Sequence, residues 1–185
     1  MTQTPSTYPK FNGHAHNGIT TQASNPYERM RLQALEPHAA FIDSPQPGAI
    51  AVVGSSVETL ANPSLRTALT ASVERFDYTL ADIAWISRET TSVQASTQGD
   101  NSAGALDDKA LLTVIEALDP IALIICDEES ARACAHAYRT SINLDCATTL
   151  LIRPCACFTN LVFLLDTQSG KQRAWHILKE TLSTL

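Results

Sequence analysis

Residues 54–58, Gly-Ser-Ser-Val-Glu, place two hydroxyls and a carboxylate directly after the apolar run at 50–53. A short, uninterrupted apolar run of β-prone residues predicts a strand buried on both faces. Ligands of open α/β sheets usually bind at the carboxyl ends of such strands. A helix starting here would also present backbone N–H groups to a small anion. The segment lacks the glycine spacing of either nucleotide-binding fingerprint, so it predicts a ligand site without specifying a nucleotide.

Two pairs of potential metal ligands stand two residues apart, His14 with His16 and Cys155 with Cys157. The histidines lie in a polar segment, and the chain is too short for the roughly 250-residue barrel of metal-dependent hydrolases in which such a pair ends the first strand. The cysteines lack a second cysteine or histidine pair at ligand spacing. We therefore predict no metal and no cofactor. Cys155, next to Arg153, would gain thiolate character only if exposed.

The elements that must position these residues alternate along the chain. Strands are predicted over residues 50–53, 83–87, 121–126 and 148–153, the last stopped by Pro154. Helices are predicted from Asn25 to before Pro37, from Asn62 through Phe76, from Asp107 or Asp108 to before Pro120, from Asp127 to Arg139 and over 171–184. Residues 161–165 fit a short strand or a buried helical turn equally well. The alternation favours a parallel sheet with helices on both faces.

Composition indicates one domain. The chain has 185 residues, of which 44% are hydrophobic, enough for a single core. Residues 1–24 are polar and aperiodic, which predicts a flexible N-terminal arm, and residues 88–108 predict a long polar loop within a single α/β domain over 25–185. Five cysteines, an odd number in a chain that shows no secretion signal, favour reduced thiols over a disulfide framework.

Charge and hydropathy limit the classes of partner that the sequence predicts. The formal net charge of −6 gives no global attraction to polyphosphate, which lowers the expectation of nucleic-acid binding. No apolar run approaches the roughly 20 residues of a membrane span. We expect a cytoplasmic protein with no membrane partner and leave its oligomeric state open.

The order of elements, together with several phrases, resembles the uracil-DNA glycosylase superfamily over roughly residues 48–185. These phrases are a strand ending in glycine, "RFDYTLADIAWIS", "IEALDPIALIICD", "TTLLIRP" and the final "KQRAWHILKETL". The resemblance implies a three-layer α/β/α fold of the DNA-repair type. Its four-stranded parallel sheet would have the order 2-1-3-4, with a cleft at the carboxyl ends of the strands.

Enzymes of this family flip a uracil out of DNA and cleave its glycosidic bond. They use an acidic or polar group in the first loop, an aromatic platform, an asparagine that reads the base and a histidine that stabilises developing charge. By position, only Gly54 matches the first loop firmly, with Glu58 as a displaced carboxylate. Ser87 and Arg88 stand where the asparagine is expected. Arg153, Pro154 and Cys155 align with the histidine, proline and serine after the fourth strand.

The resemblance thus assigns two catalytic candidates, Arg153 and Glu58. Its candidate ligand-binding residues are Gly54, Ser55, Ser56, Ser87, Arg88 and Cys155. The cysteine spacing does not support the iron–sulfur cluster of some members. Loss of one oxyanion donor typically reduces the rate about 100- to 1000-fold. We therefore expect a divergent member with a degenerate active site and without efficient uracil excision.

Two function classes stay open for this divergent member. In the first, its cleft binds a base, a nucleotide or a small anion, and any residual activity is that of a DNA base glycosylase in which Arg153 favours the leaving anion. The alternative is a non-enzymatic interaction module that uses the fold as a scaffold. An open pocket of base size with a basic rim would favour the first class, and a filled pocket with an acidic rim the second.

Overall fold

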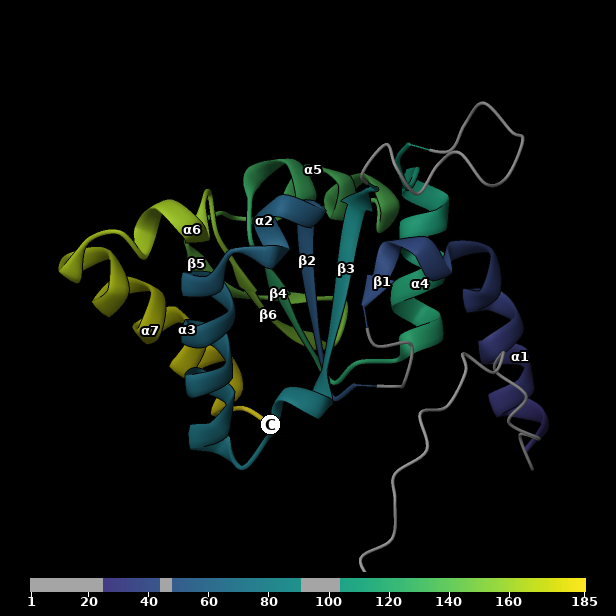
Figure 1. Ribbon diagram of the computed structural model, residues 1–185, viewed down its shortest axis with the longest axis horizontal. Helices are drawn as coiled ribbons and strands as arrows, with labels where there is room; N and C mark the ends of the chain where they lie inside the picture. The colour runs from purple at the N-terminus through teal and green to yellow at the C-terminus, as the bar shows by residue number, and fades with distance from the viewer. Residues whose placement is uncertain (1–24, 44–47, 91–103) are drawn as a thin grey trace, which may run out of the picture.

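The computed structural model describes residues 25–43, 48–90 and 104–185, so the predicted arm over 1–24 lies outside the described residues. Figure 1 shows one sheet with helices on both faces. The strands are β1 (Ile42–Asp43), β2 (Ile50–Ser56), β3 (Ile83–Glu89), β4 (Ala122–Ile125), β5 (Cys146–Leu150) and β6 (Arg153–Cys157). The helices are α1 (Pro26–Leu35), α2 (Val57–Ala61), α3 (Pro63–Val73), α4 (Asp108–Leu118), α5 (Glu128–Ala137), α6 (Leu161–Leu164) and α7 (Gln168–Leu182), with short 3-10 turns at η1 (Glu36–Phe41), η2 (Glu74–Phe76) and η3 (Leu80–Asp82).

The sheet is six-stranded, in the order β1-β3-β2-β4-β6-β5. The central strands β3, β2, β4 and β6 are parallel, and β1 and β5 pair antiparallel at the two edges. Alternate residues of each strand face opposite sides: Val53 packs with α1, α4 and α5, while Val52 packs with α2, α3, α6 and α7. Both faces of the central strands are therefore apolar, which confirms the predicted α/β class.

The predicted fourth strand over 148–153 needs correction. β5 ends at Leu150, the chain turns at Leu151 with φ of 56°, and β6 begins at Arg153. Pro154 lies inside β6, opposite Thr149, instead of ending a strand. The predicted segment is thus mainly an antiparallel edge strand, and the fourth parallel strand is β6. With that change the parallel strands read β3-β2-β4-β6, within a six-stranded sheet and not the four-stranded one expected.

Helix starts follow the predicted capping residues. Asn62 accepts hydrogen bonds from the backbone of Ser64 and Leu65, and Asp107 and Asp127 cap α4 and α5 in the same way. Residues 161–164 form the short helix α6, which resolves the open choice for that segment.

Part of the segment expected as a polar loop over 88–108 belongs instead to the sheet or is bonded to it. β3 continues to Glu89, and the backbone N–H of Leu106 donates to Arg88. Residues 91–103 lie outside the described ranges. Within those ranges, none of the helices has the length and apolar character needed to cross a bilayer.

Candidate functional site

The carboxyl ends of the parallel strands gather most of the predicted site residues. Gly54 lies beside Ser87 in the β2–β3 register, and Ser56 lies beside Glu89. Ser55 precedes α2, whose first turn carries the exposed Glu58. Gly54, Ser55, Ser56, Glu58, Ser87 and Arg88 therefore lie together at the carboxyl ends of the strands, which we call the carboxyl rim. In Figure 1 this is the end at which β2 runs into α2.

The structure does not bring Arg153 and Cys155 to the carboxyl rim. Cys155 pairs with Leu123, which pairs with Ala51, so it lies near the middle of the sheet. It is fully buried, and burial raises the pKa of its thiol well above the ordinary value. Arg153 is the first residue of β6 and lies at the amino ends of the strands. The resemblance placed Arg153, Pro154 and Cys155 after the fourth strand, but all three belong to β6 itself. The residues of the expected cleft therefore do not lie together.

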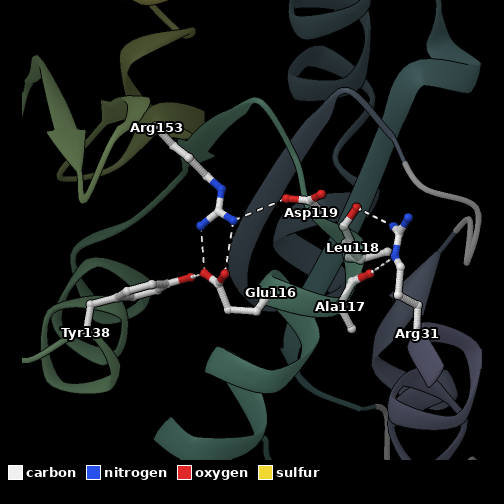
Figure 2. A network of polar contacts seen from close by, with 7 residues as sticks. All are labelled: Arg31, Glu116, Ala117, Leu118, Asp119, Tyr138 and Arg153. Carbon is white, nitrogen blue, oxygen red and sulfur yellow. Dashed lines mark hydrogen bonds and ion pairs between the residues drawn. The ribbon is translucent and has the colours of Figure 1, made fainter. Parts of the chain in front are cut away.

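Arg153 belongs instead to an ion-pair network at the amino ends (Figure 2). Its guanidinium donates to both carboxylate oxygens of Glu116, at 2.6 and 3.0 Å, and lies 3.4 Å from Asp119. The Tyr138 hydroxyl donates to the same Glu116 carboxylate at 2.6 Å. The bond from Arg153 lowers the pKa of Glu116, and reciprocally the pKa of Arg153 is raised. Arg153 therefore links β6 to the end of α4.

Beside this network, Arg31 of α1 caps the carboxyl end of α4. Its guanidinium donates to the carbonyl oxygens of Ala117 and Leu118, at 2.5 and 2.7 Å (Figure 2). The last carbonyls of a helix lack partners within the helix, so a cationic donor there is favourable. Both arginines stabilise the fold around α4 and lie away from the carboxyl rim.

At the carboxyl rim, Asp127 accepts the hydrogen bond of the Ser55 N–H, the backbone donor to which an anion could otherwise bind. Its carboxylate accepts hydrogen bonds from the N–H of Ser55 and from the N–H of Ser130, both at 2.8 Å. This single side chain caps α5 and closes the first turn after β2. An incoming anion would meet a carboxylate at the point where the β2 turn offers its amide.

The charges around the carboxyl rim are mostly negative. They are carried by Glu58, Glu89, Asp127, Glu128 and Glu129, with Arg88 paired to Glu129 at 3.3 Å. A polyanion gains affinity by pairing its phosphates with cations, and this edge offers mainly carboxylates. The rim therefore opposes the approach of a DNA backbone.

A pocket of about 310 Å³ opens beside the carboxyl rim, between β1, β3 and α2. Its polar groups are Ser87, Asp43 and Arg66, and its walls include Phe41 and Trp85. The Arg66 guanidinium covers the Trp85 ring at 4.4 Å and is held by Asp43 at 2.8 Å and by the carbonyl of Leu60 at 2.8 Å. The Ser87 hydroxyl donates to the carbonyl of Glu89, which leaves its oxygen free to accept.

Only some residues of this pocket can be predicted from the sequence. Trp85 is two residues before Ser87 in the predicted strand, so alternation along the strand places both on one face. Phe41 and Asp43 come from η1 and from a two-residue strand, which leave no periodic signal. Asp127 was expected as a helix cap, but its second bond to Ser55 crosses between two distant segments.

A second cavity, of about 650 Å³, is a groove between α3 and α7. Trp175, Leu165 and Leu178 form much of its apolar wall. Among the described residues that line the groove, the charged ones are Arg75 and Lys171. The Arg75 guanidinium lies 4.9 Å from the centre of the Trp175 ring. The groove thus combines an apolar floor with cationic sides.

Thiols and potential metal ligands are dispersed. Burial raises the pKa of Cys134 and of Cys157 to about 12, so both are protonated at neutral pH. Over residues 25–43, 48–90 and 104–185, no group of three or more His, Cys, Asp or Glu side chains has the geometry of a metal site. His14 and His16 lie outside the described residues. No model of a known protein family and no curated protein matches this sequence.

Proposed function

We propose that this protein is a divergent uracil-DNA glycosylase-like protein without efficient uracil excision, and that it binds a base-sized ligand in the pocket beside Ser87. One observation carries the proposal. A pocket of about 310 Å³ opens at Ser87, next to a rim whose anion-binding amide is occupied by Asp127. The pocket lies where ligands of open α/β sheets usually bind. The carboxylates of the neighbouring rim favour a neutral ligand over an anionic one.

The order of the parallel strands supports the kinship. They lie as β3-β2-β4-β6, which is the 2-1-3-4 order that the resemblance implies once β6 is taken as the fourth parallel strand. Gly54 has the place of the family's first-loop glycine, at the end of β2. A Cβ atom there would lie 2.6 Å from Leu60, so glycine allows α2 to pack closely against the strand.

The position of the charged groups supports the proposed absence of efficient excision. Arg153, the residue aligned with the family's histidine, is bound to Glu116 at the other end of the strands and is distant from any base at the carboxyl rim. Glu58 is exposed on α2. Loss of one donor to the leaving base reduces the rate about 100- to 1000-fold, and the acidic rim also weakens binding of DNA.

The pocket indicates the ligand class. Phe41 and the planar Arg66 guanidinium, which covers the Trp85 ring, favour a planar ligand, and the Ser87 and Asp43 oxygens accept hydrogen bonds from ring N–H or amino groups. A phosphate would add charge next to Asp43 and the acidic rim. A free nucleobase or a nucleoside therefore fits better than a nucleotide.

Titration of the full chain with uracil, cytosine, adenine and guanosine, followed by amide chemical shifts, tests the ligand. We expect saturable shifts for at least one of them. Ala61→Trp places a large side chain into the pocket and abolishes binding. Ala71→Trp, on an exposed alanine that lines the α3–α7 groove, is the matched control and retains it. Failure of all four probes to bind would refute the base-binding proposal.

Excision of uracil from single- and double-stranded oligonucleotides tests the enzyme class. We expect no turnover above that of buffer. Turnover that disappears in Glu58→Gln and persists in Arg153→Ala would instead assign an active glycosylase at the carboxyl rim.

The second candidate function, a non-enzymatic interaction module, is favoured by the α3–α7 groove. Its apolar floor and two cations match an acidic amphipathic helix of a partner, because such a helix pairs charges while burying one face. Fluorescence polarisation of a labelled acidic amphipathic peptide tests this. Binding lost in Ala71→Trp and retained in Ala61→Trp would favour the module.

A further inference from the structure

The two edges of the sheet differ in how they are protected. The β1 edge is two residues long and carries Asp43, which is paired with Arg66. At the other edge, β5 and the turn after it read Cys-Ala-Thr-Thr-Leu-Leu-Ile, residues 146–152, without charge, proline or glycine. Natural edge strands usually carry such residues because they prevent pairing with another chain. The β5 edge lacks these protections.

The pairing of β5 with β6 determines which backbone N–H and C=O groups of β5 point away from the sheet. Pro154 lies opposite Thr149 and has no N–H, so this is a pair without mutual hydrogen bonds. Because hydrogen-bonded and non-bonded pairs alternate in an antiparallel ladder, Ala147 and Thr149 direct their N–H and C=O groups away from β6. In the described part of the chain, no strand pairs with that side of β5, and no backbone hydrogen bond is made to Ala147 or Thr149 from elsewhere.

The turn at the end of β5 exposes two large apolar side chains. Leu151 is 62% exposed and Ile152 is 91% exposed. Leu151 also has a φ of 56°, in the left-handed region that branched side chains rarely adopt. Neither side chain packs into the two hydrophobic cores of the domain.

We propose that two copies of this chain pair antiparallel through β5, around a two-fold axis at Thr148. In this register Ala147 of each copy faces Thr149 of the other, and the outward N–H and C=O groups of these residues are all satisfied. The turn that carries Leu151 and Ile152 then lies beside the start of β5 in the second copy, so part of its exposed apolar surface is covered. The six-stranded sheets join into one continuous sheet.

A second copy is the occupant that the charges favour. Each chain has a formal net charge of −6, so two copies repel each other on average. Residues 146–152 are uncharged and place no like charges opposite each other across the axis. The segment is also self-complementary, as a two-fold interface requires. Because the pairing uses one short strand, the dimer dissociates on dilution.

Cysteine crosslinking in the full chain tests the register, in a Cys146→Ser background that removes the partly exposed thiol of the edge. Thr148→Cys lies on the axis, opposite its own copy in a non-hydrogen-bonded pair, where Cβ atoms are close enough for a disulfide. Oxidation with diamide is expected to give a covalent dimer rapidly. Thr149→Cys, one residue away and facing Ala147, is the matched control and crosslinks slowly.

Sedimentation measures the association itself. We expect a monomer–dimer equilibrium, and Thr149→Lys raises its dissociation constant by roughly tenfold because it places a charge on each side of the pairing. Thr184→Lys, at the exposed carboxyl terminus, leaves it unchanged. A monomer at all concentrations would overturn the proposal and leave the edge to an extended segment of another protein. A dimer insensitive to Thr149→Lys, or equal crosslinking at 148 and 149, would overturn it as well.

Discussion

Replacing Glu116 with glutamine tests the role assigned to the ion-pair network at the amino ends. The carboxylate of Glu116 accepts two bonds from Arg153 and one from Tyr138. Glutamine has nearly the same shape but no charge, and its amide offers one acceptor oxygen. The variant therefore weakens the link between α4 and β6 and leaves the packing unchanged.

The magnitude follows from burial. A hydrogen bond to a charged group contributes about 1.5–3 kcal/mol in a protected site, whereas an exposed ion pair contributes about 0–1 kcal/mol. The Arg153 side chain is 14% exposed and that of Glu116 is 43% exposed, so solvent screens part of the interaction. We expect Glu116→Gln to lower the free energy of unfolding by about 1.5 kcal/mol. For a chain of this length this corresponds to a fall of about 3–6 °C in Tm.

The effect depends on pH in a defined direction. The pKa of Glu116 is lowered in the folded protein, so its stabilising contribution is present above the unfolded value of about 4.3 and is lost as pH falls through the lower, folded value. Urea unfolding, followed by tryptophan fluorescence, should show the full difference between the two proteins at pH 7 and 5. The difference should shrink below pH 4.

Glu180→Gln is the matched control, since Glu180 is an exposed glutamate late in α7. It should change the free energy of unfolding by less than about 0.5 kcal/mol. Equal effects of the two substitutions, or a Glu116 effect that persists unchanged at pH 3.5, would refute the reasoning. Loss of base binding in Glu116→Gln at a temperature where the variant remains folded would also contradict the separation of Arg153 from the ligand site.

Three further predictions concern other contacts. Asp127→Ala removes the cap of α5 and the bond to Ser55, and it should lower the free energy of unfolding by about 2 kcal/mol in urea, more than Asp107→Ala, which removes a cap alone. Gly170→Ala should lower the free energy of unfolding by about 1–3 kcal/mol, because the added Cβ would overlap the carbonyl oxygen of Leu164. Gly104→Ala, where no atom lies within 4 Å of the added Cβ, should be neutral. In the folded protein, Cys146 should react with an aromatic disulfide reagent before the four buried cysteines, and comparable rates for all five would contradict their burial.

Helix starts were predictable because capping is local. Asn62 and Asp127 each precede an apolar stripe, and a side-chain oxygen at that position bonds to backbone N–H groups two or three residues later. The parallel strands β2, β3 and β4 were equally accessible, since each is an apolar run followed by a polar turn. These features predicted the α/β class, which the structure confirms.

The position of Arg153 was not predictable, because it depended on one strand boundary. A run ending in Arg-Pro reads as the end of a strand, since proline usually interrupts a ladder. In the structure, Pro154 is tolerated because it faces Thr149 in a pair that requires no bond from its nitrogen. Shifting the boundary moves Arg153 from the carboxyl end of one strand to the amino end of the next.

The pocket beside Ser87 depends on contacts between distant segments. Arg66 of α3 reaches Trp85 of β3 and Asp43 of β1, which are separated by long stretches of chain. No local pattern encodes such a contact. The two-residue length of β1 also gives no alternation from which to assign a face.

The attachment of α1 through Arg31 has a consequence for local opening. Of the ten residues of α1, Leu35 is the one buried side chain, and Tyr27 and Met30 are exposed. Its hold on the domain combines the packing of Leu35 and Ala34 against the core with the two bonds from Arg31 to carbonyl oxygens of α4. The amides of α1 are therefore expected to exchange with deuterium through detachment of this helix alone, while those of β2 and β4 exchange only when the whole domain unfolds.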